Sequence, residues 1–564
     1  MTRKVGKTLG VLALVLGLSV LGLAQTKTLT ILHVNDTHSA LLPFGNPSFP
    51  GPFAWLAATH GRAAVVRESG GIARMATLIK KIRAMKKDVL ALHAGDVFVG
   101  SFEFNKYLGY PELKIMENLY DAMALGNHEF DLGLGALAGV VSGQLAGGDP
   151  VALPLLNANI NFKDLPLSGM VQKSIIRTVG KVKVGIFGIV NEDAENYSAE
   201  VISRFSGDVY KVAGTQAGLL RAAGCEVVIC LSHLGTTADF LGLADNVPGI
   251  DIIVGGHSHD LFEEAVVRGG KIIVQAGDYG RDLGELTVSI DPAGKVSLVD
   301  WYVHPVDSRI KPDPRLQGQL NVLRDGIVRD PRFGPVYSQI VALAGRNIEK
   351  DWPKTSPNRD GALGNLVTDA MKKALTDAGF QVDCALDAFG YTATSIQVGK
   401  VVGADVMRAV PYGYDPASGL GFKLVLAPLP GELILGGLEY STSFVEFTSA
   451  LSIQPSGLTF AYDSSKPKSP GLGQFSRLDV TSVKINGENV YPLNLKKYYY
   501  VAMSEQVFNF LNGLVGGVLV KIDTGIFEYS AVRDYMRSLR FVVYKSEGRV
   551  KDTAPAAAVK SALR

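Results

Sequence analysis

The sequence predicts a layered α/β domain followed by a smaller α/β domain. In the first half of the chain, short apolar runs of strand length alternate with stretches of helical periodicity. Polar residues gather directly after these runs, where the strands of a sheet would end. In the second half, strand-like runs are mixed with turns and short helices, which indicates a separate folding unit.

Apolar residues spaced three and four apart predict a helix over 72–85. A helical connector is predicted over 314–344, interrupted by Pro331 and Pro335, and a further helix over 363–375. The predicted strands of the first domain are 29–34, 89–92, 122–125, 182–190, 227–231 and 251–254. Those of the second domain are 398–401, 422–426, 458–462 and 498–502.

The composition is that of an ordinary globular protein. Of 564 residues, 47% are hydrophobic and 20% are charged, and the formal net charge is +2. This balance argues against a disordered chain and gives no electrostatic reason to expect a nucleic acid polymer as partner.

The N-terminus predicts export. Arg3, Lys4 and Lys7 precede an apolar run over 9–23, and small residues near Ala24 suit a cleavage site. The apolar run is short for a membrane span, so we interpret residues 1–24 as a signal peptide, with an uncleaved anchor as the alternative. Because the chain from Lys551 onward carries no apolar tail, we expect a periplasmic or extracellular protein without a stable membrane anchor after cleavage.

Cysteines and one insertion complete the general features. Cys225, Cys230 and Cys384 do not make a disulfide framework, and the first two flank an apolar run and are expected in the core. Residues 43–69 are rich in proline, glycine and aromatics and predict a surface insertion. We interpret this insertion as a surface loop without a direct function. The alternative is a lid or a loop that contacts a partner.

Residues 126–131, Gly-Asn-His-Glu-Phe-Asp, form the clearest candidate for a functional loop. They follow a predicted strand, and Gly126 allows the chain to turn at once. The amide oxygen of Asn127 can bind a metal ion, and His128 can act as an acid or stabilise negative charge. Asp131 can hold the imidazole in one tautomer. Taken alone, the motif is equally compatible with a structural loop.

Similar ligand types follow other predicted strands. These are Asp36, His38, Asp96, His233, His257 and His259. A mixture of carboxylate, imidazole and amide predicts a two-metal site, in which Asp96 is the natural bridging carboxylate. The alternatives are a single-metal site or a structural zinc site, but structural zinc favours cysteine-rich ligand sets, which the sequence does not offer.

These motifs resemble those of the calcineurin-like metallophosphoesterases. More narrowly, the chain resembles the exported two-domain 5'-nucleotidase family over nearly the whole mature sequence, especially through the segments 125–133 and 156–159. The resemblance implies a four-layer αββα metallophosphoesterase sandwich, a helical linker and a C-terminal substrate-binding domain that rotates towards the metals. The implied boundaries are 1–24 for the signal peptide, 25–308, 309–345 and 346–550.

The resemblance also implies roles for single residues. Two divalent metal ions are expected, with Zn, Mn, Mg, Co and Ca all left open as their identity. One ion would be held by Asp36, His38, Asp96 and His259, and the other by Asp96, Asn127, His233 and His257. His128 would stabilise the transferring phosphoryl group or protonate the leaving oxygen, with Asp131 orienting it. Asn159 would lie on the substrate side.

The C-terminal match is looser. Residues 359–365 resemble the family's Arg-Glu-x-Asn-Leu-Gly-Asn, which makes Arg359 a candidate phosphate ligand. Tyr412 stands where the family carries a phenylalanine that stacks on the base. The family's Asn-Gly-Gly-Ile-Arg segment is replaced by residues 387–393, which contain no arginine, and its second stacking aromatic and Gly-Gly-Asp segment are replaced by residues 504–510.

The sequence thus predicts an exported, divalent-metal-dependent phosphohydrolase, in first place a 5'-nucleotidase acting on a small phosphate ester. One alternative is a phosphodiesterase or pyrophosphatase acting on cyclic nucleotides or nucleotide sugars, and another is a sulfur-ester hydrolase of the same fold. A catalytically silent binding protein is disfavoured because unused metal ligands are costly to bury. The oligomeric state is left open.

Overall fold

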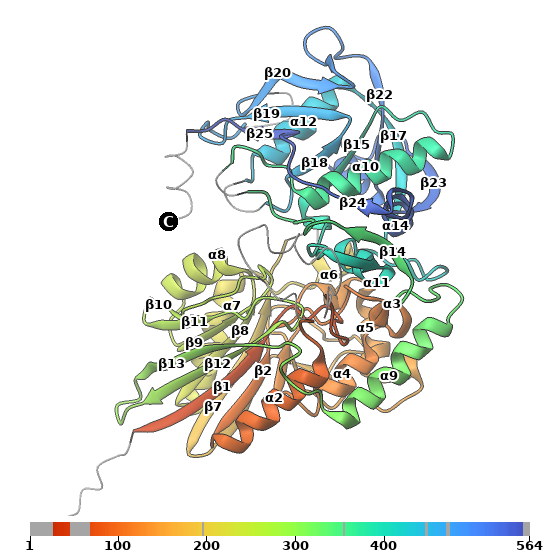
Figure 1. The fold of residues 1–564 in the computed structure, drawn as a ribbon. Coiled ribbons are helices and arrows are strands. Elements are labelled where there is room, and N and C mark those ends of the chain that lie inside the picture. Colours follow the sequence, from red (N-terminus) through yellow and green to blue (C-terminus); the bar gives the residue numbers. More distant parts are fainter. Residues whose placement is uncertain are drawn as a thin grey trace, which may run out of the picture.

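The computed structural model describes residues 26–45, 68–193, 197–353, 356–445, 449–469 and 474–555. The predicted signal peptide and most of the predicted insertion over 43–69 lie outside these residues and stay predictions. Within the described ranges, no helix has the length and apolar character needed to cross a membrane. The chain forms two domains that pack against each other, the N-terminal one in red to green and the C-terminal one in cyan to blue (Figure 1).

Two sheets form the centre of the N-terminal domain. The strand order is β13-β12-β1-β2-β3-β4-β5 in the first sheet and β10-β11-β9-β8-β7-β6 in the second. The first contains β1 (Lys27–Val34), β2 (Val89–His93), β3 (Ala122–Ala124), β4 (Leu155–Leu156), β5 (Val171–Gln172), β12 (Asp282–Ile290) and β13 (Val296–Pro305). The second contains β6 (Ser174–Val179), β7 (Val182–Val190), β8 (Val227–His233), β9 (Ile252–Gly255), β10 (Val266–Arg268) and β11 (Lys271–Val274).

Helices cover the outer faces of both sheets, which confirms the predicted four-layer αββα sandwich. Apolar side chains such as Ile31 and Ile229 fill the space between the sheets. Residues of α2, α4 and α5 pack on the outside of the first sheet, and residues of α7 pack on the outside of the second. The helices are α2 (Ile72–Met85), α3 (Phe102–Tyr107), α4 (Tyr110–Met116), α5 (Gly133–Val141), α6 (Ala199–Ile202), α7 (Val209–Ala222) and α8 (Thr236–Ala238), with the short 3₁₀ turns η1 (His128–Phe130) and η2 (Gln144–Ala146) and the π-helical segment η4 (Asp239–Ala244).

The central strands are buried on both faces, which explains why their sequences are nearly continuous apolar runs. In the first sheet β1, β2 and β3 run parallel, and in the second β7, β8 and β9 run parallel. The carboxyl ends of parallel neighbours lie at one edge of their sheet. Loops that are far apart in sequence therefore meet there.

The linker differs in part from the prediction. Helix α9 (Pro314–Arg329) begins at Asp313, whose carboxylate accepts a hydrogen bond of 3.0 Å from the Leu316 amide. Its apolar face packs on the hydrophobic core of the N-terminal domain. The prediction of helix as far as residue 344 is wrong, because the helix ends before Pro331 and residues Ile340–Ala344 form strand β14. This strand pairs with β16 and β24.

The C-terminal domain is built on a five-stranded sheet of order β18-β15-β22-β17-β23. Its helices are α10 (Ala362–Asp377), α11 (Gly403–Ala409), α12 (Gly431–Thr442), α13 (Glu505–Leu514) and α14 (Glu528–Leu539), with the turn η5 (Phe389–Tyr391). Its strands are β15 (Cys384–Ala388), β16 (Gly399–Val402), β17 (Lys423–Pro430), β18 (Ile453–Ser456), β19 (Leu458–Tyr462), β20 (Leu478–Ile485), β21 (Glu488–Asn489), β22 (Tyr498–Ser504), β23 (Ile522–Phe527), β24 (Phe541–Val542) and β25 (Val550–Asp552). The three cysteines are free and buried, as expected for Cys225 and Cys230.

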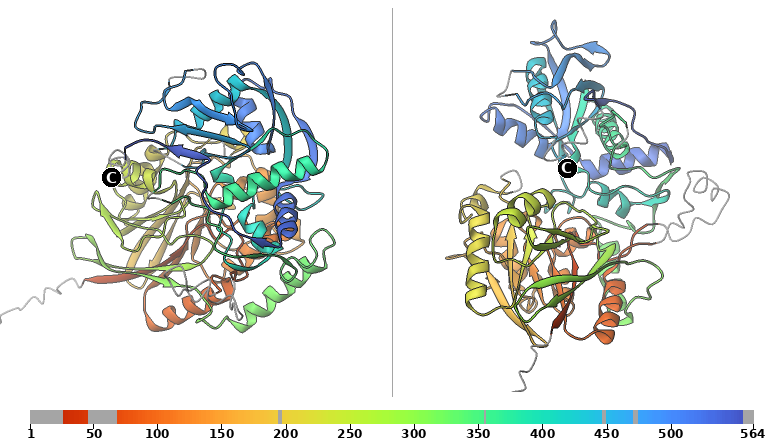
Figure 2. Two further views of the ribbon diagram at one scale, coloured as in Figure 1. Left: turned by 45° about the horizontal axis from the view of Figure 1, so that its top comes forward. Right: turned by 90° about the vertical axis from the view of Figure 1, so that its left-hand side faces the viewer.

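The two domains touch through aromatic and polar contacts. The Phe102 ring of α3 lies 5.2 Å from the ring of Phe333 and 5.5 Å from that of Tyr529 in α14. The Asn105 amide donates a hydrogen bond of 2.9 Å to the Gly419 carbonyl. Two further views show that the C-terminal domain packs against one end of the αββα sandwich (Figure 2). This arrangement places C-terminal loops over the carboxyl ends of the central strands of the N-terminal domain.

Candidate metal centre

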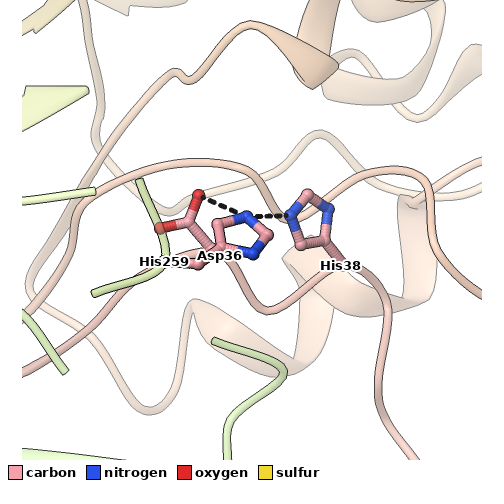
Figure 3. A group of neighbouring side chains, drawn as sticks. All are labelled: Asp36, His38 and His259. Atoms are coloured by element: carbon pink, nitrogen blue, oxygen red, sulfur yellow. Dashed lines mark hydrogen bonds and ion pairs between the residues drawn. The ribbon is translucent and has the colours of Figure 1, made fainter. Parts of the chain in front are cut away.

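Asp36, His38 and His259 form the first group of possible metal ligands (Figure 3). Asp36 and His38 directly follow β1, and His259 follows β9 in the other sheet. The Nε2 atoms of His38 and His259 lie 3.0 Å apart, and Nε2 of His259 lies 3.4 Å from Oδ1 of Asp36. Donor atoms from both sheets thus converge on one point.

Asp96, His233 and His257 form the second group. Nε2 of His233 lies 3.0 Å from Oδ2 of Asp96, and Oδ1 of Asn127 lies 3.0 Å from Nδ1 of His257. Nε2 of His233 is also 3.8 Å from Oδ1 of Asp36, which belongs to the first group. The structure therefore brings together every residue that the sequence predicted as a metal ligand.

The backbone of the ligand loops is unusual. Several of the predicted ligands have left-handed φ angles: Asp36 (49°), His38 (47°), Asp96 (58°), His257 (72°) and His259 (59°). Non-glycine residues rarely adopt this region, and strained backbone of this kind clusters at functional sites. Gly126 is needed for a different reason, since a Cβ there would come 2.2 Å from Oδ1 of Asp96.

The electrostatics of the site suit a cation. Burial would raise the pKa of the Asp36 and Asp96 carboxyls, but the neighbouring histidines hold both below the usual range. Burial lowers the pKa of His257 to about 4, which keeps its ring neutral and able to bind a metal. Burial would also lower the pKa of His233, yet the Asp96 and Asp36 carboxylates raise it to about 9.

One buried atom gives an independent test of whether a metal fits. Nε2 of His233 is buried and makes no hydrogen bond among the described residues, although it points at two carboxylates. Buried polar atoms normally have a partner. A set of imidazole nitrogens, carboxylate oxygens and an amide oxygen matches the preferences of borderline and hard divalent ions. The residues present therefore fit a divalent metal centre.

Glu129 supports this centre, although its role cannot be seen from the sequence alone. Its carboxylate accepts hydrogen bonds from backbone amides of two loops, those of Gly126 (2.6 Å), Asp96 (3.0 Å), Val97 (2.7 Å) and Phe98 (3.1 Å). The side chain thereby ties the loop after β2 to the loop after β3. The one sequence feature that points to a role for Glu129 is its position next to His128 in the 126–131 motif.

Other supporting residues contact the ligands from behind. The Asn35 amide donates a hydrogen bond of 2.7 Å to Asp36, and Nδ1 of His259 lies 3.1 Å from Asp278. Nδ2 of Asn191 lies 2.9 Å from Nε2 of His257. Such partners fix ring orientation at metal sites. Asn191 follows β7 and Asp278 follows β11 within a few residues. A search for polar residues just after predicted strands would therefore have identified both.

His128 lies beside the two groups with the geometry of an acid. Its Nδ1 is 2.8 Å from Oδ2 of Asp131, as the sequence predicted, and its backbone amide donates a hydrogen bond of 2.9 Å to Asp96. Burial would lower the pKa of His128, but the carboxylates of Asp131 and Asp96 raise it to about 9. A ring whose protonated form is favoured by two neighbouring carboxylates can donate a proton.

The predicted substrate residues lie in different surroundings. The Tyr412 ring stacks on His128, with centroids 5.3 Å apart and planes at 20°. Asn159 is fully buried, and its side chain donates to and accepts from the backbone of Val190. Arg359 donates to the carbonyls of Ser356 and Asn358 and lies 3.4 Å from Asp552. Only Tyr412 thus faces the metal centre through a described contact.

Comparisons with known proteins agree with this geometry. Residues 29–261 match the calcineurin-like phosphoesterase family, and residues 345–513 match the C-terminal domain of 5'-nucleotidases. Relatives called 5'-nucleotidase align across nearly the whole chain; that of Mus musculus is 28% identical over 94% of this chain and 92% of its own. The chain is a two-domain metallophosphoesterase of the 5'-nucleotidase family.

Solved structures support the same family assignment. A 5'-nucleotidase precursor from Thermus thermophilus superposes with a TM-score of 0.78 and 29% identity, covering 94% of this chain and all of that one. The sulfate thiohydrolase SoxB of the same organism shares the fold, with a TM-score of 0.71 at 20% identity. The chain spans 35% of the trifunctional nucleotide phosphoesterase YfkN of Bacillus subtilis, to which it is 28% identical. Like other members of the 5'-nucleotidase family, the chain is a phosphoric monoester hydrolase.

Proposed function

We propose that this protein is an exported, divalent-metal-dependent 5'-nucleotidase. The observation that carries the proposal is the adjacency of the two ligand groups, connected by the 3.8 Å approach of His233 to Asp36. Relatives named 5'-nucleotidase along the whole chain support nucleotides as the substrate class. Export rests on the N-terminal sequence. The proposed divisions are 25–308 for the catalytic domain, 309–345 for the linker and 346–550 for the substrate-binding domain.

We assign the ligands to two divalent ions. One would be held by Asp36, His38, Asp96 and His259, and the other by Asp96, Asn127, His233 and His257. When bound, the ions would supply Lewis acidity towards the phosphoryl group and acidify a water molecule for attack. Glu129 would hold the two ligand loops in register through its backbone hydrogen bonds.

His128 would act as the general acid. Its Nδ1 is held by Asp131, and its Nε2 carries no hydrogen bond among the described residues, so this atom can face the substrate. A protonated ring can stabilise the transferring phosphoryl group and then give its proton to the leaving oxygen. Because Asp131 also fixes the ring orientation, the proton would be presented in one direction.

A substrate panel tests the proposal directly. Purified protein would be given 5'-mononucleotides, cyclic nucleotides, UDP-sugars and an aryl phosphate, each with and without a chelator. We expect 5'-mononucleotides to be hydrolysed with the highest kcat/KM and the activity to disappear with chelation and return with metal. Preferred hydrolysis of a cyclic nucleotide or a UDP-sugar would contradict the 5'-nucleotidase assignment.

Tyr412 provides a prediction about substrate binding. Base-on-aromatic stacking contributes about 1–3 kcal/mol, so we expect Tyr412→Ala to raise KM for a mononucleotide about tenfold or more. KM for an aryl phosphate should change little, and Tyr412→Phe should restore the nucleotide KM. Steady-state kinetics on both substrates is the measurement.

Arg359 is the second candidate for substrate binding in the C-terminal domain. If its guanidinium binds the phosphate, Arg359→Ala will weaken the binding of both substrates, and that of the nucleotide more strongly. Its contacts with Ser356, Asn358 and Asp552 support a structural role instead, which predicts a lower melting temperature and unchanged KM values. Equal, small effects of Tyr412→Ala on every substrate would mean that the C-terminal domain does not recognise a base through this ring.

A further inference from the structure

The C-terminal domain lacks the arginine expected in residues 387–393, and Arg359 is engaged elsewhere. A phosphate-binding domain nevertheless needs a cation near the catalytic centre. Lys350, on the segment between β14 and α10, is a candidate for this cation. Its Nζ lies 4.9 Å from the centroid of the Phe389 ring.

The Lys350 ammonium has no anionic partner in the part of the chain that the structure describes. It makes no ion pair within 4.0 Å and no side-chain hydrogen bond there. Other lysines that lie over aromatic rings do have one: Lys423 lies over Phe527 and pairs with Asp415 at 3.0 Å. Burial lowers the pKa of Lys350, while the charges of Asp351 and Asp278 raise it. An anionic ligand would stabilise this half-buried charge.

The backbone around Lys350 is held firmly. The Lys350 amide donates a hydrogen bond of 2.9 Å to the Ser395 hydroxyl, which in turn donates one of 3.0 Å to Glu349. A Cβ at Gly361 would come 2.0 Å from the Lys350 carbonyl, so the two segments are in close contact. The start of the side chain is therefore fixed, and only its flexible end can adjust.

Aromatic contacts on either side of one turn lead from Lys350 towards His128. Phe389, under the ammonium, and Tyr391 belong to the same turn, η5. The Tyr391 ring lies 6.3 Å from that of Tyr412, which stacks on His128. The Asp278 carboxylate, which lies 3.1 Å from Nδ1 of His259, is one of the two charges that raise the pKa of Lys350 against the effect of burial. The ring contacts place the ammonium on the side of the C-terminal domain that carries Tyr391 and Tyr412.

We infer that Lys350 is the cation through which the C-terminal domain binds the phosphoryl group of the substrate, in place of the absent arginine. This inference rests on the proposed function. Phe389 positions the side chain by offering its ring face to the ammonium. A lysine ammonium is a point charge, whereas an arginine makes a bidentate contact in one plane. Lys350 would therefore bind the phosphate in a wider range of orientations than an arginine would.

The test separates charge recognition from base recognition. Lys350→Met, Lys350→Gln and Lys350→Arg would be compared in the metal-loaded full chain, with metal content and melting temperature measured for each. Lys497→Met is the matched control, because Lys497 also lies over an aromatic ring, Tyr499, but pairs with Glu488. Binding of inorganic phosphate is measured by calorimetry, and inhibition by phosphate and by adenosine is measured with an aryl phosphate as substrate.

A hydrogen bond to a charged group contributes about 1.5–3 kcal/mol, which corresponds to about tenfold or more in affinity. We therefore expect Lys350→Met and Lys350→Gln to weaken phosphate binding at least tenfold, with adenosine inhibition unchanged. Lys350→Arg should restore most of the affinity, and Lys497→Met should match the wild type. Wild-type phosphate affinity in both neutral variants would overturn the inference while leaving the proposed function intact. If the wild type neither hydrolyses nucleotides nor binds phosphate, the proposed function itself fails.

Discussion

Asp96→Asn is expected to lower the metal content and nearly abolish hydrolysis. Oδ2 of Asp96 lies 3.0 Å from Nε2 of His233, and Oδ1 accepts a hydrogen bond from the His128 amide. The substitution keeps the shape of the side chain but removes the negative charge that we propose both ions share. Metal analysis and kcat on a mononucleotide are the measurements. Full turnover in this variant, or in chelated wild type, would exclude the two-metal mechanism.

Asp88→Asn is the matched control for this experiment. Asp88 also has a left-handed backbone, with φ of 57° against 58° for Asp96, but it lies exposed at the start of β2. Asparagine tolerates this backbone region as well as aspartate does. The control should therefore keep wild-type metal content and activity, and any loss in Asp96→Asn can be attributed to the missing charge.

His128→Ala is expected to keep both metals while kcat falls by about 10²–10⁴, the range for a positioned acid. The adjacent ligand atom is Oδ1 of Asn127, which approaches His257 within 3.0 Å, so removal of the imidazole leaves the ligand set intact. The measurements are metal stoichiometry and kcat with a mononucleotide.

His304→Ala serves as the control for the loss of a histidine. His304 pairs with Glu285 at 2.7 Å on the strands β12 and β13 and is no part of the proposed site. It should retain full activity. Loss of metal from His128→Ala would show instead that His128 is itself a ligand, and unchanged kcat would remove it from the mechanism.

The grouping of the candidate metal ligands could be predicted from sequence because each of them lies at the end of an apolar strand or within a few residues of it. Asp36 after β1 and Asp96 after β2 are visible without knowledge of the strand order, since parallel neighbours bring such positions together. The supporting contacts were harder to predict. Glu129 acts on backbone amides of another loop, and a hydrogen bond between loops leaves no pattern in either sequence.

Other parts of the chain depend on contacts that are distant in sequence. Ile340–Ala344 forms a strand because β16 and β24 pair with it, and its own sequence does not distinguish this from a helix. Arg359 matched a motif, but its position beside Asp552 depends on a strand almost two hundred residues further along the chain. The four-layer sandwich followed from the local alternation of strands and helices together with the family resemblance.

The left-handed backbone at the ligand positions restricts how this centre can change over evolutionary time. At such φ angles aspartate, asparagine and histidine are the favoured non-glycine residues, and β-branched residues are strongly disfavoured. These three residue types are also oxygen and nitrogen donors for divalent ions. Exchanges among them at Asp36, His38 or His257 can alter the hardness of the donor set without altering the course of the chain. The backbone at these positions is therefore compatible with several different sets of metal-donor atoms.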